Sequence, residues 1–378
     1  MTRRCVGAMT KYERVMAAIE HKPVDKVPAF CLGADFEFYH DFMHEVGFKK
    51  SDFEQYLKDG IVDTPPINHA LAVELGFDCD WYTHTSRLHY DPELNSLVDT
   101  WGSKQKVVVR DSGIPHMWYT GPFLTSKRKI LEWWDQGRPS GYSDILLRKV
   151  KKQMKTLLKP KYDEHVMFLG LSGPYECISM AIGLGRLAKY CRKDPDFVDE
   201  ILRRNLEVQL DGLKNLCKVG PPVIMCGDDH GFVNGLQMPV KHWRRFIKPA
   251  LQEYVDLVHS YGIKFIIHSC GNIGEIFPDF VEMGIDGVES LQPTINDLPM
   301  LKRKYGDDLT LLGTIDDTHL LVEENPAMVR KIVNAQIKTL GKDSGFLPGA
   351  TNFLLNQKVE NIQEMVATIH EFDAGTLF

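Results

Sequence analysis

From residue 165 onward, short apolar runs alternate with longer segments of helical periodicity. The apolar runs occupy residues 165–173, 223–229, 264–271, 287–292, 309–315 and 345–349. The helical segments include residues 195–218, 239–261, 325–340 and 359–372. Short apolar runs are typical of strands buried on both faces of a parallel sheet, and several helical segments open with Pro or Asn, as helices often do. The alternation therefore predicts a repeated strand–helix–strand unit.

Two further apolar runs, residues 26–31 and 77–82, bring the predicted strands to eight. Eight such units close a (β/α)8 TIM barrel, which is the α/β fold that we predict. An open doubly wound sheet is the alternative. That fold normally carries a Gly-rich phosphate loop after its first strand, and residues 30–35 do not form one.

The N-terminal part contains one segment that does not fit the repeat. Residues 97–123 are rich in Val, Trp and Gly and are expected to form a β-hairpin insertion, with helices over residues 126–159. We expect the insertion, residues 97–160, to cap one mouth of the barrel. No low-complexity linker divides the chain, so residues 1–378 are expected to form a single domain.

Composition narrows the classes of partner. Hydrophobic residues make up 43% and charged residues 25% of the chain, which is ordinary globular usage. The net charge of −6 provides no broad basic surface for nucleic acid. Eight scattered cysteines without a CxxC pair fit a reducing cytoplasm. The sequence has no run of eighteen apolar residues and no secretion signal, so we expect a cytoplasmic protein without membrane contact.

Candidate chemistry lies where the apolar runs end, because catalytic groups of a (β/α)8 barrel project from the carboxyl ends of its strands. Polar residues at these ends are Glu176, Asp228, Asp229, His268, Cys270, Glu289, Gln292, Asp316, Asp317, Thr351 and Asn352. Of these, Glu176, Asp228 and Asp229 are candidate catalytic acids. Candidates for substrate binding are Trp81, Tyr175, Gln292 and Asn352.

The motif His268-Ser-Cys270 places two soft ligands on one face of a strand, where both could reach a zinc ion. A core histidine beside a buried cysteine is the alternative. The adjacent Asp228 and Asp229 repel each other, which can raise one pKa for acid catalysis or favour a cation, although Asp also caps helices. Cys226 would face the same way as Asp228, as a ligand or as packing.

Glu176 follows Gly173-Pro174-Tyr175 near a predicted helix start, where the helix dipole favours an anion. Simple helix capping is the alternative role. Aromatic residues are dense in the N-terminal third of the chain, and they could line a pocket for a flat ligand or simply form core. They are Trp81, Tyr82, Trp101, Trp118, Tyr119, Trp133 and Trp134.

Five segments carry a resemblance to a known family: residues 11–28 (KYERVMAAIEHKPVDKVP), 227–229 (GDD), 268–272 (HSCGN), 291–293 (LQP) and 359–365 (VENIQEM). They resemble the uroporphyrinogen decarboxylase superfamily across nearly the whole chain, and most closely its branch of corrinoid-dependent methyltransferases. In the thiol-methylating members of that branch, a His-x-Cys pair and a distant C-terminal cysteine bind zinc. His268 and Cys270 match the pair, whereas residues 349–353 contain no cysteine. The resemblance therefore leaves Glu176, Asp228 or Cys226 as further ligands.

The resemblance also implies a reaction. Other relatives demethylate methoxylated aromatics or methylated amines, and pass the methyl group to the Co(I) corrinoid (cobalamin) of a separate small protein. We expect O-demethylation of an aryl methyl ether, because the phenolate that leaves has a conjugate acid of pKa about 10 and needs a proton donor or a Lewis acid. Analogy with the family gives a homodimer as the expected assembly.

Two alternatives remain open. A decarboxylase of this family carries an arginine-bearing motif after its first strand, but residues 31–37 contain two acids and no arginine. A non-catalytic binding barrel that has lost its chemistry is the other alternative.

Overall fold

Eight parallel strands form the central sheet. The computed structural model describes residues 7–34, 38, 67–83, 88–91, 96–109, 115–135 and 165–378. The strands are β1 (Phe30–Cys31), β2 (Cys79–Thr83), β7 (Val166–Ser172), β8 (Val223–Gly227), β11 (Lys264–His268), β12 (Gly287–Glu289), β13 (Thr310–Leu312) and β14 (Phe346–Leu347). They lie side by side in this order. All eight predicted strands are present.

The first and last strands meet, which closes the sheet. The Phe30 amide donates to the Pro348 carbonyl at 2.9 Å, and the Leu354 amide donates to the Gly33 carbonyl at 2.9 Å. A Cβ atom at Gly349 would collide with the backbone of Phe30, so only glycine allows this approach. These contacts confirm the (β/α)8 barrel.

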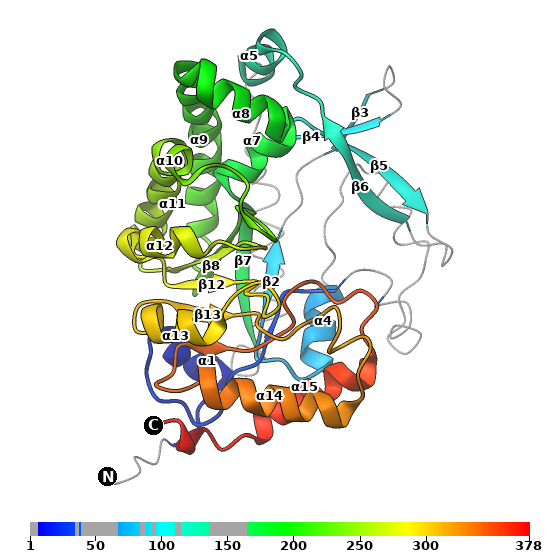
Figure 1. Cartoon of the computed structure of the whole chain (residues 1–378), viewed down its shortest axis with the longest axis vertical. Coiled ribbons are helices and arrows are strands. Elements are labelled where there is room, and N and C mark those ends of the chain that lie inside the picture. The colour runs from blue at the N-terminus through cyan, green and yellow to red at the C-terminus, as the bar shows by residue number, and fades with distance from the viewer. Residues whose placement is uncertain are drawn as a thin grey trace.

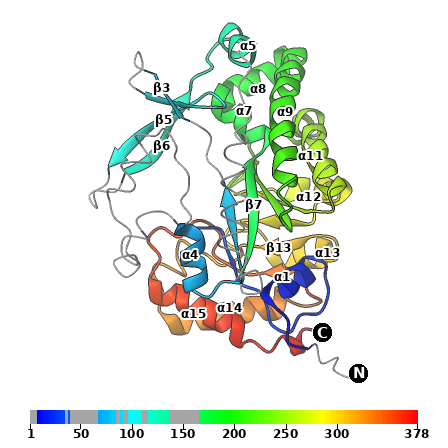
Figure 2. The ribbon, with the colours of Figure 1, turned by 180° about the vertical axis from the view of Figure 1, so that it is seen from behind.

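Helices alternate with the strands and lie outside the sheet (Figures 1 and 2). They are α1 (Lys11–Ile19), α4 (Ile67–Glu74), α7 (Pro174–Ile182), α8 (Leu184–Lys193), α9 (Pro195–Cys217), α12 (Phe277–Met283), α13 (Leu298–Tyr305), α14 (Pro326–Leu340) and α15 (Val359–Glu371). Their buried faces pack against one continuous apolar core. None of the helices in the described ranges is long and apolar enough to span a bilayer. The expected cytoplasmic location stays a prediction.

The helix predicted over residues 239–261 is interrupted. It consists of α10 (Val240–His242), a π-helical turn (Trp243–Ile247) and α11 (Lys248–Ser260). Pro249 lies in the first turn of α11 and has no amide hydrogen to bond a carbonyl one turn earlier. The π-helical turn accommodates the missing hydrogen bond, because its amides bond carbonyls five residues earlier instead of four.

The insertion is larger than the predicted hairpin. Strands β3 (Leu88–Asp91), β4 (Ser96–Asp99), β5 (Ser103–Val109) and β6 (Pro115–Pro122) form a separate antiparallel sheet, followed by α5 (Lys127–Asp135). This sheet extends away from the barrel beside α7 (Figure 1). It is anchored there by the hydrogen bond from the Tyr119 hydroxyl to the Met180 carbonyl, at 2.9 Å. Most residues of the predicted helices after α5 lie outside the described ranges, and the single-domain organisation stays a prediction.

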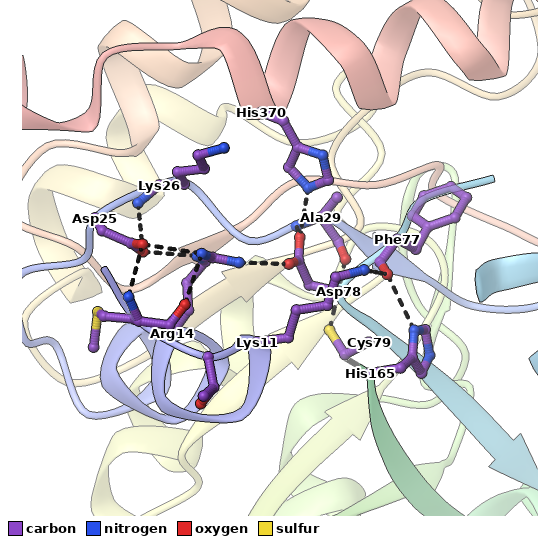
Figure 3. A network of polar contacts seen from close by, with 12 residues as sticks. Lys11, Arg14, Asp25, Lys26, Ala29, Phe77, Asp78, Cys79, His165 and His370 are labelled. Carbon is purple, nitrogen blue, oxygen red and sulfur yellow. Dashed lines mark hydrogen bonds and ion pairs between the residues drawn. The ribbon is translucent and has the colours of Figure 1, made fainter. Parts of the chain in front are cut away.

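A buried polar network joins the two ends of the chain at the amino ends of the strands (Figure 3). Asp78, fully buried before β2, accepts hydrogen bonds from Arg14 of α1 at 2.9 Å, from the Ala29 amide at 2.8 Å and from His370 of α15 at 2.7 Å. Arg14 also pairs with Asp25 at 2.8 Å. Burial alone would raise the pKa of Asp78, but His370 and the other donors hold it below its ordinary value. The network fixes α1 and α15 against the barrel.

Candidate active site and metal centre

Three neighbouring strands bring the predicted site residues together. Strands β8, β11 and β12 are adjacent in the sheet, and residues at or just after their carboxyl ends are Asp229, His268 and Glu289. His268 and Glu289 lie directly opposite each other in the register of β11 and β12. The site therefore lies at the end of the barrel where active sites of this fold occur.

Asp229, His268 and Cys270 form a group that could hold a metal ion. One ligand atom from each lies within 4.8 Å of the other two. His268 Nε2 lies 3.6 Å from Asp229 Oδ1 and 3.8 Å from Cys270 Sγ. A nitrogen, a sulfur and a carboxylate oxygen are all zinc ligands. Asp229 is thus a third candidate ligand for the metal site predicted at His268 and Cys270.

Glu289 supports the imidazole of His268 from behind. Its Oε2 atom is hydrogen-bonded to His268 Nδ1, and its side chain is fully buried. Its Oε1 atom has no hydrogen-bond partner in the described part of the chain. A carboxylate on one ring nitrogen leaves the other for a metal, which is the usual arrangement around zinc-binding histidines. These residues fit a zinc ion bound at Nε2.

Charges in this pair are strongly perturbed. Burial opposes a charged imidazole, but the Glu289 carboxylate and Cys270 outweigh it and raise the pKa of His268 well above its usual value. Burial raises the pKa of Glu289, and the nearby His268 only partly lowers it again. Without a metal, the buried proton of His268 therefore neutralises its acidic neighbours. A metal ion would replace that proton.

Ser290 holds the sulfur of Cys270. Its hydroxyl group lies 3.2 Å from Cys270 Sγ and donates to the Thr351 carbonyl at 2.8 Å. A hydroxyl has one hydrogen, so Ser290 can donate either to the Thr351 carbonyl or to Cys270 Sγ, and a thiolate at Cys270 would accept it. Ser290 has a φ of 71°, a left-handed conformation that is uncommon for a residue with a side chain. The backbone is therefore held in a strained conformation next to the sulfur.

The loops after β8 and β11 are in backbone contact. The Cys270 amide donates to Asp229 Oδ1 at 2.7 Å, and the Asn272 amide donates to the Phe232 carbonyl at 2.8 Å. A Cβ atom at Gly231 would lie 2.7 Å from the Cys270 carbonyl oxygen, and Gly271 is crowded against Gly231 in the same way. The two glycines allow the loops to approach closely enough to bring Asp229 to Cys270.

Asp228 points away from this group and caps a helix. Its Oδ1 atom accepts from the Glu176 amide at 2.6 Å, and its Oδ2 atom accepts from the Tyr175 amide at 3.3 Å. It is fully buried, and burial raises its pKa, whereas the two amide groups oppose that shift. The helix-capping alternative thus describes its observed contacts. Its predicted catalytic role is tested by none of these observations.

Glu176 lies in the first turn of α7, is half-buried, and interacts electrostatically with Asp229 and His268. Burial, together with the charge of Asp229, raises its pKa to about 7, against a smaller opposing effect of His268. At neutral pH a large fraction of Glu176 is therefore protonated and can donate a proton. Such a shifted acid is typical of catalytic sites.

Trp81 is the one predicted aromatic residue that contacts His268. The two rings stack with centroids 5.7 Å apart, and Phe353 lies 6.3 Å from Trp81 on another side. Trp81 is 8% exposed, and its indole nitrogen has no hydrogen-bond partner within the described ranges. A Cβ atom at Gly170 would overlap the indole, so that glycine makes room for it.

Other predicted residues have structural contacts. Gln292 accepts from the Gly271 amide at 3.0 Å, Asn352 accepts from the following amide at 2.8 Å, and the Tyr175 hydroxyl donates to Gln237 at 3.3 Å. Cys226 is fully buried, and burial raises its pKa well above its usual range. Within the described residues, the metal-binding group contains Asp229 but neither Cys226 nor Asp228, and the ligand roles of those two residues stay predictions. The substrate-binding roles stay predictions.

The remaining tryptophans mostly stabilise the insertion. Trp101 packs on Trp134 with centroids 6.2 Å apart, and Trp133 donates to the Thr100 carbonyl at 3.1 Å. They pack as core between β3–β6 and α5, which is the alternative to lining a ligand pocket. Trp118 is 56% exposed. The pocket for a flat ligand stays a prediction.

Sequence reasoning gave no role to Glu289 or Ser290. Glu289 does appear among the polar strand ends, but its pairing with His268 depends on the register of two strands that are separated in sequence. The position of Ser290, directly after a strand end, is the only local signal for that residue. Both functions therefore emerge only from the three-dimensional arrangement.

Comparisons with known proteins agree with this architecture. The profile of the family described as Uroporphyrinogen decarboxylase (URO-D) matches residues 126–372. The methylcobamide:CoM methyltransferase MtaA of Methanosarcina barkeri is 25% identical over 206 residues, which cover 54% of this chain and 58% of that protein. The chain thus matches little more than half the length of this curated relative.

A solved structure extends the likeness to the whole fold. The methyltransferase from Methanosarcina mazei aligns with 97% of this chain and 99% of its own, with a TM-score of 0.68 and 18% identity. At that identity the likeness concerns the fold. The family profile spans well over half of the chain, and its match agrees with the motifs around Asp229 and His268. The chain therefore belongs to the uroporphyrinogen decarboxylase (URO-D) family.

Proposed function

We propose that this protein is a methyltransferase that moves a methyl group from a small methylated donor to the Co(I) corrinoid of a partner protein. The observation that carries the proposal is the group of Asp229, His268 and Cys270 backed by Glu289 at the carboxyl ends of the barrel strands. The M. barkeri relative is a methyltransferase that uses a methylated corrinoid, as its name states, which supports the same chemistry here.

The three ligand residues would hold zinc. Bound there, zinc would act as a Lewis acid on an oxygen or sulfur atom of the substrate. Glu289 would keep the His268 ring oriented and neutral, with Nε2 toward the ion. Ser290 would hold the sulfur of Cys270 in position through its hydroxyl group.

Glu176 supplies the proton that the reaction consumes. When the bond between the methyl carbon and the ether oxygen breaks, the bonding electrons stay on oxygen and the methyl group goes to cobalt. The oxygen then accepts the proton of Glu176, whose pKa is about 7. A phenol has a pKa of about 10, so this proton transfer is favourable by about 4 kcal/mol.

An aryl methyl ether is the donor that the site supports best. Trp81 stacks on His268, so the surroundings of the metal-binding group are partly aromatic, which suits an aryl donor better than a small polar one. The leaving phenolate also makes use of both the proposed zinc and Glu176. Methylated amines are the other donor class to be compared directly.

Transfer to a thiol is the second candidate function. The M. barkeri relative methylates coenzyme M according to its name, and Cys270 with His268 provides a nitrogen and sulfur environment for zinc. In that case the methyl group would move from the corrinoid to a thiolate, and Glu176 would have no leaving oxygen to protonate.

One experiment separates these reactions. The zinc-loaded protein is mixed with Co(I) cobalamin and, separately, with methoxybenzenes and methylamines, and formation of methylcobalamin is followed by absorbance. The reverse assay supplies methylcobalamin and a thiol. We expect transfer from methoxybenzenes that His268→Ala and Cys270→Ala abolish. Transfer only to the thiol would establish the second candidate, and no transfer in any assay would favour a binding barrel.

A further inference from the structure

A buried chain of contacts runs from Trp243 to the first turn of α7. Trp243, His230 and Asp228 are each at most 1% exposed. The indole nitrogen of Trp243 donates to His230 Nδ1 at 3.3 Å. Because Nδ1 accepts this bond, the neutral imidazole carries its hydrogen on Nε2. Trp243 therefore selects one tautomer of His230.

The protonated nitrogen of His230 faces Asp228. Nε2 lies 3.4 Å from Asp228 Oδ2, a close polar contact that falls short of hydrogen-bond geometry, and it has no hydrogen-bond partner in the described part of the chain. The rings of Tyr175, Trp243 and Phe280 surround the imidazole at centroid distances of 5.4, 5.6 and 6.5 Å. Because Nδ1 accepts the indole hydrogen, the ring carries a single hydrogen and is neutral. Among these contacts only Asp228 offers it a strong acceptor.

Asp228 replaces a missing local cap on α7. The residue before this helix is Gly173, which has no side chain to cap it, and Pro174 occupies the first turn. The carboxyl group of Asp228, at the end of the neighbouring strand β8, instead accepts from the amides of Tyr175 and Glu176. A Cβ atom at Gly173 would collide with Asp228, so glycine leaves the space that the carboxylate fills. The start of α7 thus depends on the position of Asp228.

We propose that His230 is a positioning residue: locked in its Nε2–H form by Trp243, it orients Asp228, which holds the start of α7 and so places the Glu176 carboxyl group near Asp229 and His268. The consequence for Glu176 rests on the proposed methyl transfer. The tautomer of His230 and the orientation of Asp228 do not depend on that proposed reaction. An ordinary core histidine would contribute packing alone, and its polar contacts would be replaceable by apolar ones.

The first test needs no activity. In zinc-loaded protein labelled with ¹⁵N-histidine, long-range ¹H–¹⁵N correlation spectra report the tautomer of each imidazole, and His230→Gln identifies the signals of His230. We expect a single neutral Nε2–H tautomer near pH 7. Trp243→Phe retains an aromatic ring but removes the donor, and should give a mixture of tautomers. A charged ring or an Nδ1–H tautomer in the wild-type protein would overturn the proposal.

The second test separates a donor at this position from simple packing. His230→Gln places an amide N–H near the position of Nε2–H and should retain most of the kcat for methyl transfer. His230→Leu fills the space without a donor and should lower kcat about 10²-fold, as expected for a misplaced catalytic group, with KM and zinc content unchanged. His319→Gln, on a side chain that is 67% exposed, is the matched control and should leave both constants unchanged.

The combination of variants decides the outcome. If His230 acts through Glu176, adding His230→Leu to Glu176→Gln should lower kcat no further than the Glu176 change alone. A His230→Leu protein with wild-type kcat would disprove the positioning role. A wild-type protein that shows the Nε2–H tautomer but transfers no methyl group would disprove the proposed function and leave the contact of His230 with Asp228 standing.

Discussion

At the level of single residues, the most consequential contact is the one between Glu289 and His268. Replacing Glu289 by Gln keeps the shape but removes the negative charge behind the imidazole. Loss of such a supporting carboxylate typically weakens metal binding 10-fold to 100-fold. We expect that Glu289→Gln weakens zinc binding by about this factor, measured by competition with a chromophoric chelator.

The matched control is Glu360→Gln, at an exposed glutamate in the first turn of α15. It should leave the zinc affinity unchanged. His268→Ala removes a ligand and should abolish stoichiometric binding altogether. Equal zinc affinities for Glu289→Gln and the wild-type protein would show that Glu289 does not support the ion.

The pH dependence of methyl transfer should follow the ionisation of Glu176. Its pKa is raised to about 7, so its proton is present below that pH and is lost as the pH rises. We expect kcat to decline above about pH 7 in the wild-type protein. Glu176→Gln should lower kcat by about 10²- to 10⁴-fold and remove this decline. Stopped-flow absorbance of the corrinoid measures both effects.

Glu253→Gln, an exposed position on α11, serves as the control and should reproduce the wild-type profile. A wild-type rate that is flat across neutral pH, with Glu176→Gln fully active, would remove Glu176 from the mechanism.

At the level of elements, Asp78 joins α1 and α15 to the barrel (Figure 3). Asp78→Asn would leave the buried guanidinium of Arg14 without one of its two carboxylate partners. Breaking a buried ion pair in this way typically costs 3–5 kcal/mol. We expect the free energy of unfolding in urea to fall by about that amount, whereas Asp211→Asn, at an exposed site on α9, should change it little.

The same residue should contribute to acid unfolding. The pKa of Asp78 is lower in the folded protein than its ordinary value, so its stabilising effect is complete above about pH 4 and is lost as the pH falls through the folded-state pKa. Stability of the wild-type protein should therefore drop more steeply with acid than that of Asp78→Asn. Parallel curves from urea titrations at several pH values would contradict this assignment.

The regular part of the fold could be predicted from the sequence because each strand is a short apolar run that ends in a polar residue or glycine. The segment 264–271, for example, gives β11 and places His268 at its end. The interruption at Trp243–Ile247 was missed because a helical period continues through it, and only the missing amide of Pro249 marks it. The four-stranded insertion was underestimated because the predicted hairpin began at residue 97 and left out β3, although Pro92 and Asn95 between β3 and β4 are typical turn residues.

The candidate site was only partly predictable. Period-two alternation correctly brought His268 and Cys270 together, since both lie at the end of one strand. Asp228 instead caps α7, a helix more than forty residues earlier in the chain, so no local pattern could reveal its partner. The difference between Asp228 and its neighbour Asp229 is one of side-chain direction, which depends on how the loops after β8 and β11 meet.

At the level of the whole molecule, the barrel separates stabilising contacts from chemical ones. Asp78 lies at the amino ends of the strands and Glu289 at the carboxyl ends, and their side chains share no hydrogen-bond partner among the described residues. Mutational effects at distant sites usually add within about 0.5 kcal/mol. We expect the free energy of unfolding of the double variant Asp78→Asn/Glu289→Gln to fall by the sum of the decreases that the two single variants show. Urea titrations with a chelator present measure all three decreases.

The reciprocal measurement uses zinc. Asp78→Asn should bind zinc with wild-type affinity under conditions where it remains folded, because the closed sheet between the two ends is unchanged. Weaker zinc binding by Asp78→Asn, or a strongly non-additive double variant, would mean that the two ends of the barrel are energetically coupled.

The close approach of Gly231 and Gly271 also has a consequence for engineering this protein. A methyl group at either position would push apart the loops that carry Asp229 and Cys270. Saturation libraries aimed at new substrates should therefore keep both glycines fixed and diversify the exposed neighbours Phe232 and Val233, which are 52% and 67% exposed. Because the two glycines pack against each other, a side chain at either one would displace both loops at once.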